Sequence, residues 1–102
     1  MSLLSFFGWG KIKNALRQGA IVIDVRTPFE FDNGRVPDSI NIPMDRISIN
    51  TERLKNMNRP IIICSNSIYE SGKAVKKLQK AGIKNVLNGG AWISLGKIQQ
   101  KL

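Results

Sequence analysis

The sequence predicts an α/β fold with a mostly parallel central sheet flanked by helices. Residues 20–25 and 61–64 form two short apolar runs rich in β-branched residues, as buried strands are. Each run is followed by a helical pattern, so strands and helices alternate along the chain. A length of 102 residues fits one domain with a single hydrophobic core.

Residues 1–19 are predicted to be an apolar, helical segment that packs on a domain formed by residues 20–102. Ile12, Ala15 and Leu16 fall at helical spacing, and Gly19 is a natural C-cap. The alternative is a membrane-surface anchor through residues 3–9, because aromatic and basic residues stand close together there. We favour packing on the domain and expect no membrane partner.

The pattern Thr27-Pro28-Phe29-Glu30 predicts a short helix that begins with a capping box and ends at residues 33–34. A short strand over residues 39–42 and one or two short helices over residues 44–58 follow. After the second apolar run, helical spacing from Ser71 onward predicts a helix with lysines on its outer face. A strand over residues 85–88, a tight turn at residues 89–90 and a short basic helix or frayed tail complete the chain.

Composition excludes several kinds of chemistry. The chain has 16 Lys and Arg against 7 Asp and Glu, and the net charge of +9 would attract small anions or an acidic protein partner. The basic residues are dispersed, so no nucleic acid is expected as a partner. With no histidine and one cysteine, we expect no metal site, no cofactor, no disulfide and no histidine-dependent triad. A cytoplasmic location is the simplest expectation, because no apolar run could span a bilayer.

The only cysteine, Cys64, lies where the second strand is expected to end and a polar loop to begin. Backbone N–H groups and the positive end of the next helix would favour a thiolate or a bound anion there. Alternatively, Cys64 is a small apolar residue that completes a core strand. Asp24, at the end of the first strand, is either a ligand contact or a structural partner of Arg26, and we favour the structural interpretation.

With these elements in order, the chain resembles a single-domain rhodanese, a sulfurtransferase with a three-layer α/β fold. The resemblance covers about residues 20–95. It rests on Ile23-Asp24-Val25-Arg26, Phe29-Glu30-Phe31, Gly34-Arg35-Val36, Ile40-Asn41-Ile42-Pro43, Ser71-Gly72-Lys73-Ala74 and Asn88-Gly89-Gly90. It implies that Cys64 takes sulfane sulfur from thiosulfate or a persulfide donor and passes it to a thiol acceptor. Asp24, Arg26, Arg35 and Lys73 are the candidate supporting residues.

The candidate active-site loop departs from the family pattern Cys-x-x-Gly-x-Arg-Ser. It consists of Ser65, Asn66, Ser67, Ile68, Tyr69, Glu70 and Ser71. Alignment on Ser71 puts Glu70 in place of the arginine, Ile68 in place of the glycine, and Ser65 in place of the nucleophile. Alignment on Cys64 gives a loop one residue longer, as in phosphatases of this fold, and Glu70 again replaces the arginine.

Two functions therefore remain open. One is sulfur transfer through a Cys64 persulfide, with Lys73 or Arg35 offsetting the charge of Glu70. The other is an inactive binding or regulatory module, for instance for an acidic partner. Phosphatase activity is not expected, because a carboxylate in the loop repels phosphate. The position of Cys64 distinguishes the two open functions. Sulfur transfer requires the Cys64 sulfur at the centre of the loop's N–H groups, whereas an inactive module has Ser65 there and Cys64 in the core.

Overall fold

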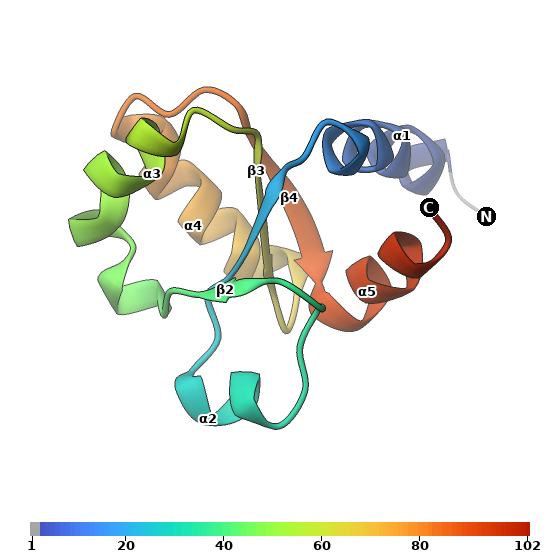
Figure 1. The fold of residues 1–102 in the computed structure, drawn as a ribbon, viewed down its shortest axis with the longest axis horizontal. Helices are drawn as coiled ribbons and strands as arrows, with labels where there is room; N and C mark the ends of the chain where they lie inside the picture. Colours follow the sequence, from blue (N-terminus) through green and yellow to red (C-terminus); the bar gives the residue numbers. More distant parts are fainter. Residues whose placement is uncertain (1–2) are drawn as a thin grey trace.

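A computed structural model, which describes the backbone of residues 3–102 and the side chains from Trp9 onward, shows a three-layer α/β fold (Figure 1). The strands are β1 (Ile21–Asp24), β2 (Ile40–Asn41), β3 (Ile61–Ser65) and β4 (Val86–Ala91). They form one sheet in the order β2-β1-β3-β4, and every neighbouring pair is parallel. The predicted α/β class with a parallel sheet is confirmed.

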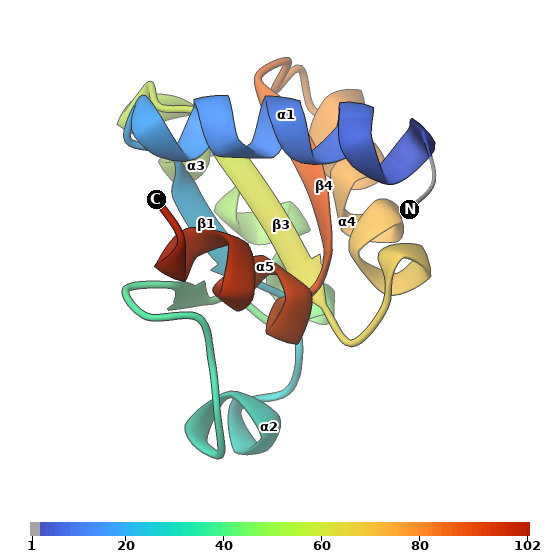
Figure 2. The same cartoon turned by 90° about the vertical axis from the view of Figure 1, so that its right-hand side faces the viewer.

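Helices cover both faces of this sheet. They are α1 (Leu3–Arg17), α2 (Pro28–Asp32), α3 (Thr51–Met57), α4 (Ile68–Lys80) and α5 (Trp92–Gln100), with 3₁₀ turns η1 (Met44–Arg46) and η2 (Ser48–Asn50) before α3. Figures 1 and 2 show α3 and α4 on one face and α1 and α5 on the other, with α2 beyond the end of the sheet. No helix within the described residues combines the length and apolarity needed to cross a bilayer.

Each face of the sheet carries its own apolar cluster. Side chains alternate along a strand, so Ile61 and Ile63 of β3 pack with the buried side of α3 and α4. Ile62 and Cys64 pack instead with residues of α1 and α5. The side chain of Cys64 therefore lies on the face of the sheet opposite α4.

The N-terminal helix contributes to the second of these clusters. Ile12 and Ala15 are buried in it, and Trp9 packs against it. After α1, Gly19 has a φ of +84°, the left-handed conformation expected of a C-cap residue. The predicted alternative was a membrane-surface anchor through residues 3–9. Except for Trp9, the side chains of that segment lie outside the described part of the chain.

The capping box that begins α2 is present as predicted. The Thr27 hydroxyl accepts a hydrogen bond from the Glu30 N–H at 3.2 Å, and the Glu30 carboxylate accepts one from the Thr27 N–H at 3.2 Å. These bonds satisfy N–H groups that the first turn would otherwise leave without partners.

Two details differ from the sequence prediction. α4 begins at Ile68 rather than Ser71, because Ser67 is its N-cap and accepts a hydrogen bond from the Glu70 N–H at 3.3 Å. Gly89 and Gly90 form no tight turn but continue β4 through a shift in its pairing with β3. A Cβ at Gly89 would lie 2.7 Å from Ile62 Cγ2, so only glycine fits there.

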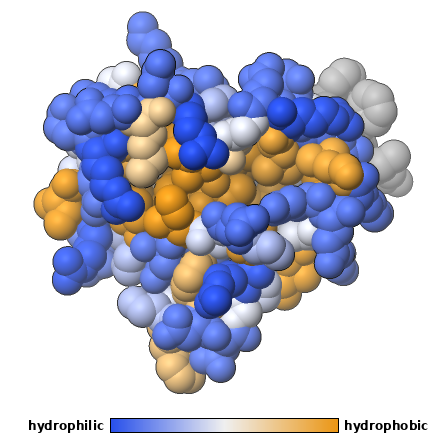
Figure 3. Space-filling view, viewed as in Figure 1, coloured by the Kyte–Doolittle hydropathy of each residue, from blue (hydrophilic) through white to orange (hydrophobic). Residues whose placement is uncertain are grey.

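The β2 edge of the sheet is short and lies beside a cavity. β2 has only 2 residues, so it pairs with β1 over Ile23 and Asp24 alone. Figure 3 shows apolar residues gathered in the middle of this side of the molecule, with hydrophilic residues around them. A cavity of about 420 Å³ lies at this edge. Its lining is mixed, with apolar Leu16, Ala20, Ile21, Val22, Pro37, Ile40 and Leu102 and polar Asp38, Arg59 and Gln99.

Candidate functional site

The candidate site lies at the carboxyl edge of the sheet, where α/β proteins bind ligands. β1 leads into α2, β3 into α4, and β4 directly into α5 at this edge. Only Asn66 and Ser67 separate β3 from α4. The expected loop over residues 65–71 is therefore divided: Ser65 belongs with Cys64 to the strand, and Ile68 to Ser71 belong to the helix.

Cys64 is fully buried within β3. Its exposed fraction is 0%, and the side chains of Ile62 and Leu95 belong to the same apolar cluster. Burial, followed by the negative charge of Asp24, raises the pKa of the Cys64 thiol to about 12, and Arg26 offsets this only in part. At pH 7 the buried thiol is therefore protonated, whereas the thiolate is the nucleophilic form.

Ser65 is the last residue of β3 and pairs with Ala91 of β4. Alternation along the strand directs its side chain to the face that α4 covers, opposite to that of Cys64. It is also buried. Of the two candidates for the nucleophile position, Ser65 is therefore the one on the same face as the start of α4.

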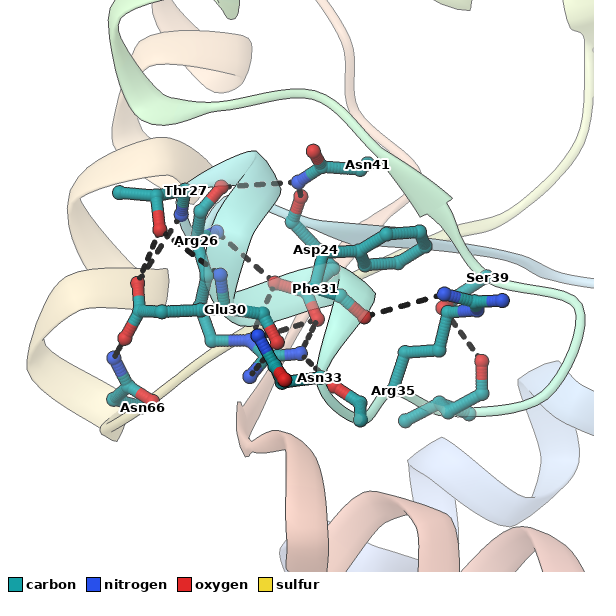
Figure 4. A network of polar contacts seen from close by, with 12 residues as sticks. Asp24, Arg26, Thr27, Glu30, Phe31, Asn33, Arg35, Ser39, Asn41 and Asn66 are labelled. Carbon is teal, nitrogen blue, oxygen red and sulfur yellow. Dashed lines mark hydrogen bonds and ion pairs between the residues drawn. The ribbon is translucent and has the colours of Figure 1, made fainter.

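The short loop after β3 is tied to α2. Asn66 Nδ2 donates a hydrogen bond to Glu30 Oε2 at 2.8 Å, as Figure 4 shows. This bond, together with those from Thr27, holds the pKa of Glu30 below its usual value. Glu70 and Lys73 lie on the exposed side of α4, with 3.7 Å between Oε1 and Nζ. A carboxylate that already pairs with Lys73 weakens that lysine as an anion ligand.

Asp24 and Arg26 form a buried ion pair, shown in Figure 4. Arg26 Nη2 lies 2.8 Å from Asp24 Oδ2, and Arg26 Nε donates to both carboxylate oxygens at 3.0 Å. Arg26 Nη2 also donates to the Gly34 carbonyl at 2.6 Å, and the guanidinium stacks on Trp92 at 4.4 Å from the ring centroid. Through these contacts the pair links the loop around α2 to α5.

The remaining supporting candidates do not approach Cys64. Arg35 is exposed, stacks on Phe31 at 4.8 Å and donates to the Phe31 carbonyl at 3.3 Å. Lys73 is exposed on α4. Of the predicted supporting residues, only Asp24 and Arg26 lie beside the thiol, and they make it less acidic overall because the effect of Asp24 is the larger.

Sequence reasoning missed the part that Asn88 plays at this edge. Asn88 Oδ1 accepts hydrogen bonds from the Ser71 hydroxyl and the Gly90 N–H, and its Nδ2 donates to the Ile68 carbonyl at 3.0 Å. These bonds fix the first turn of α4 to the end of β4. A polar residue just before two glycines in a strand was the available signal, and the predicted tight turn obscured it.

The fold and this edge define the class of the protein: a parallel α/β domain whose candidate site lies between a central strand and the helix that follows it. The chain belongs to the rhodanese-like domain family, whose model matches residues 9–91. The predicted three-layer rhodanese-like fold is thus confirmed.

Relatives and solved structures agree with this assignment. The chain is 33% identical to YqhL of Bacillus subtilis over 80% of its own length and 66% of that protein's. It is 32% identical to a protein of Allochromatium vinosum named sulfurtransferase, over 78% of this chain and 77% of that one. A rhodanese from E. coli, solved with anions, is 26% identical and has a TM-score of 0.67. The match covers 74% of this chain and 89% of that one. A protein from Staphylococcus saprophyticus is 26% identical with a TM-score of 0.70, and the match covers 85% of this chain and 88% of that one.

Proposed function

We propose that this chain is a rhodanese-like binding module that carries no sulfur on Cys64 and contacts its partner at the carboxyl edge of the sheet. The observation that carries this proposal is the position of the Cys64 thiol. It is fully buried, it belongs to the cluster formed with α1 and α5, and its pKa is raised to about 12. A sulfur donor in solution cannot reach a thiol in that place.

Charge adds a second obstacle to thiosulfate chemistry. The donor is a dianion, and two carboxylates disfavour it at this edge: Asp24, which already raises the pKa of the thiol, and Glu70 in the first turn of α4. Among the side chains that the structure describes, the buried cation beside Cys64 is Arg26, whose hydrogen bonds go to Asp24 and to the carbonyls of Glu30 and Gly34. Most of the donors of this guanidinium are therefore already engaged within the protein, which weakens it as an anion ligand.

Sulfur transfer through a Cys64 persulfide is the second candidate. What favours it is the 32% identity to the Allochromatium vinosum protein that is named sulfurtransferase. For Cys64 to act in this way, the end of β3 would have to separate from β4 and turn the thiol towards solvent. That movement would break the pairing of Cys64 with Gly90 and expose part of the core.

The test is thiosulfate-to-cyanide sulfur transfer by the purified chain, beside Cys64→Ala and Glu70→Arg. We expect all three proteins to turn over at the rate of the protein-free control. Glu70→Arg separates the obstacle of charge from the obstacle of burial, because it places a cation at the loop and leaves the thiol buried. Turnover by the native chain that disappears in Cys64→Ala would overturn the proposal, as would turnover gained in Glu70→Arg together with a sulfur adduct on Cys64.

A further inference from the structure

The carboxyl edge of the sheet exposes a group of large apolar side chains, which we call the apolar rim. The rim consists of Phe29, Ile68, Tyr69 and Ile93, which are 77%, 58%, 80% and 54% exposed. They are four of the six large apolar residues exposed among the side chains that the structure describes. Each lies in the first turn of a helix that directly follows a strand of the parallel sheet. All four side chains therefore lie at the carboxyl edge of the sheet, where they offer apolar surface to a protein partner.

Contacts between the elements hold this rim in place. The hydrogen bond of 2.8 Å between Asn66 and Glu30 ties the loop before α4 to α2. On the other side, a Cβ at Gly90 would lie 3.8 Å from Ile68 Cβ, so the end of β4 packs beside the start of α4. The rim residues are thus carried by elements that are fixed to one another, as a preformed binding surface requires.

A row of lysines continues from the rim along α4. Lys73, Lys76 and Lys80 follow Tyr69 by four, seven and eleven residues, which places all four side chains along one side of the helix. We call the three lysines the lysine row, and all of them are exposed. Within the described residues, the ion pairs are Arg26–Asp24, Lys55–Glu52 and Lys73–Glu70, so Lys76 and Lys80 take part in none.

We propose that the apolar rim and the lysine row together dock an acidic segment of another protein. Its apolar side chains would cover the rim, and its carboxylates would follow the lysines of α4. The net charge of +9 supports this choice, because it draws acidic surfaces towards the chain. A duplex nucleic acid would engage the lysines, but its paired and stacked bases could not cover the rim. The proposal rests on the proposed function in assigning this edge to a partner rather than to a sulfur donor.

The test uses a fluorescent random copolymer of glutamate and tyrosine as the probe, titrated with the full chain at about 0.15 M salt. Polyglutamate, duplex DNA and phosphatidylserine vesicles are titrated beside it. We expect the copolymer to bind more tightly than any of these three. The variant K73Q/K76Q/K80Q should bind the copolymer about tenfold more weakly, because the contacts of Lys76 and Lys80 are lost and Glu70 is left without the charge of Lys73.

Two further variants separate this surface from the general charge of the chain. K11Q/R17Q/K101Q removes the same number of exposed cations from α1 and the C-terminus, and it should weaken binding by less than about threefold. Y69S/I93S should weaken binding of the copolymer about tenfold and leave binding of polyglutamate unchanged. Circular dichroism confirms that each variant is folded, which is expected because all the altered residues are exposed.

The proposal is overturned if the native chain does not bind the copolymer, or if both triple variants weaken it equally. It is also overturned if DNA or vesicles bind more tightly than the copolymer, because the partner would then be a nucleic acid or a membrane. The sulfur-transfer assay is a separate readout. Turnover by Cys64 would overturn the proposed function and leave the binding result standing, whereas loss of copolymer binding alone would overturn only the docking surface.

Discussion

Replacing Arg26 with alanine is expected to lower the free energy of unfolding by about 3–5 kcal/mol, the cost of removing one partner of a buried ion pair. The carboxylate of Asp24, which is 0% exposed, would be left in the core without its cation. The Gly34 carbonyl would also lose the hydrogen bond that fixes the loop after α2. For a domain of this size such a loss is a large part of the total stability. Urea unfolding followed by circular dichroism measures it.

Arg35→Ala is the matched control for this prediction. Arg35 is also an arginine that stacks on an aromatic ring, but it is exposed, and its loss should cost less than about 1 kcal/mol. The double variant Asp24→Asn/Arg26→Ala should be less destabilised than the two single effects added together, because the uncompensated charge is gone. Equal costs for Arg26→Ala and Arg35→Ala would contradict the buried ion pair.

The second large effect is expected at Gly89, where alanine should destabilise the fold by about 1–3 kcal/mol or more. A Cβ there would stand 2.7 Å from Ile62 Cγ2 and 2.9 Å from the Ile63 carbonyl oxygen. The backbone oxygen cannot move aside without disturbing β3, the central strand that carries Cys64. The loss of stability is read from thermal and urea unfolding.

Gly10→Ala serves as the control, because Gly10 lies inside α1 and nothing stands within 4 Å of its added Cβ. Alanine there should raise stability by about 0.5–1 kcal/mol through the higher helix propensity of alanine. The two substitutions are chemically identical and are expected to act in opposite directions. If Gly89→Ala were as well tolerated as Gly10→Ala, the close packing of β4 against β3 would be wrong.

The sequence was enough to predict most of the fold, because local signals agree with the final structure. The β-branched runs give β1 and β3, and the capping box gives the start of α2. The apolar spacing of α4 was also visible, although its first turn was not, since Ser67 was not recognised as the N-cap. At β4 the two glycines suggested a turn. In the structure they lie within the strand, and β3 approaches Gly89 so closely that a side chain would not fit there.

The site was harder to predict, because it depends on which way one side chain points. Residues 61–64 are buried on both faces, so the sequence shows no alternation that would reveal the face of Cys64. That face is set by the packing of β3 between α4 and the pair α1 and α5. The role of Arg26 likewise depends on Trp92, which comes from the far end of the chain.

The most direct test of the buried thiol is the rate at which iodoacetamide alkylates Cys64 in the native chain between pH 7 and 10, followed by intact mass. The fold raises the pKa of the Cys64 thiol to about 12. Above about pH 9 the thiol of an unfolded chain therefore ionises, whereas the thiol of the folded chain stays protonated. The stability that this gives is complete below pH 9 and is lost as the pH rises towards 12. We expect native alkylation to be about a thousandfold slower than in urea, and its rate to keep rising up to pH 10 instead of levelling off near an ordinary thiol pKa. Alkylation in the native chain as fast as in urea, with a midpoint near or below pH 9, would show an accessible thiolate and contradict the account.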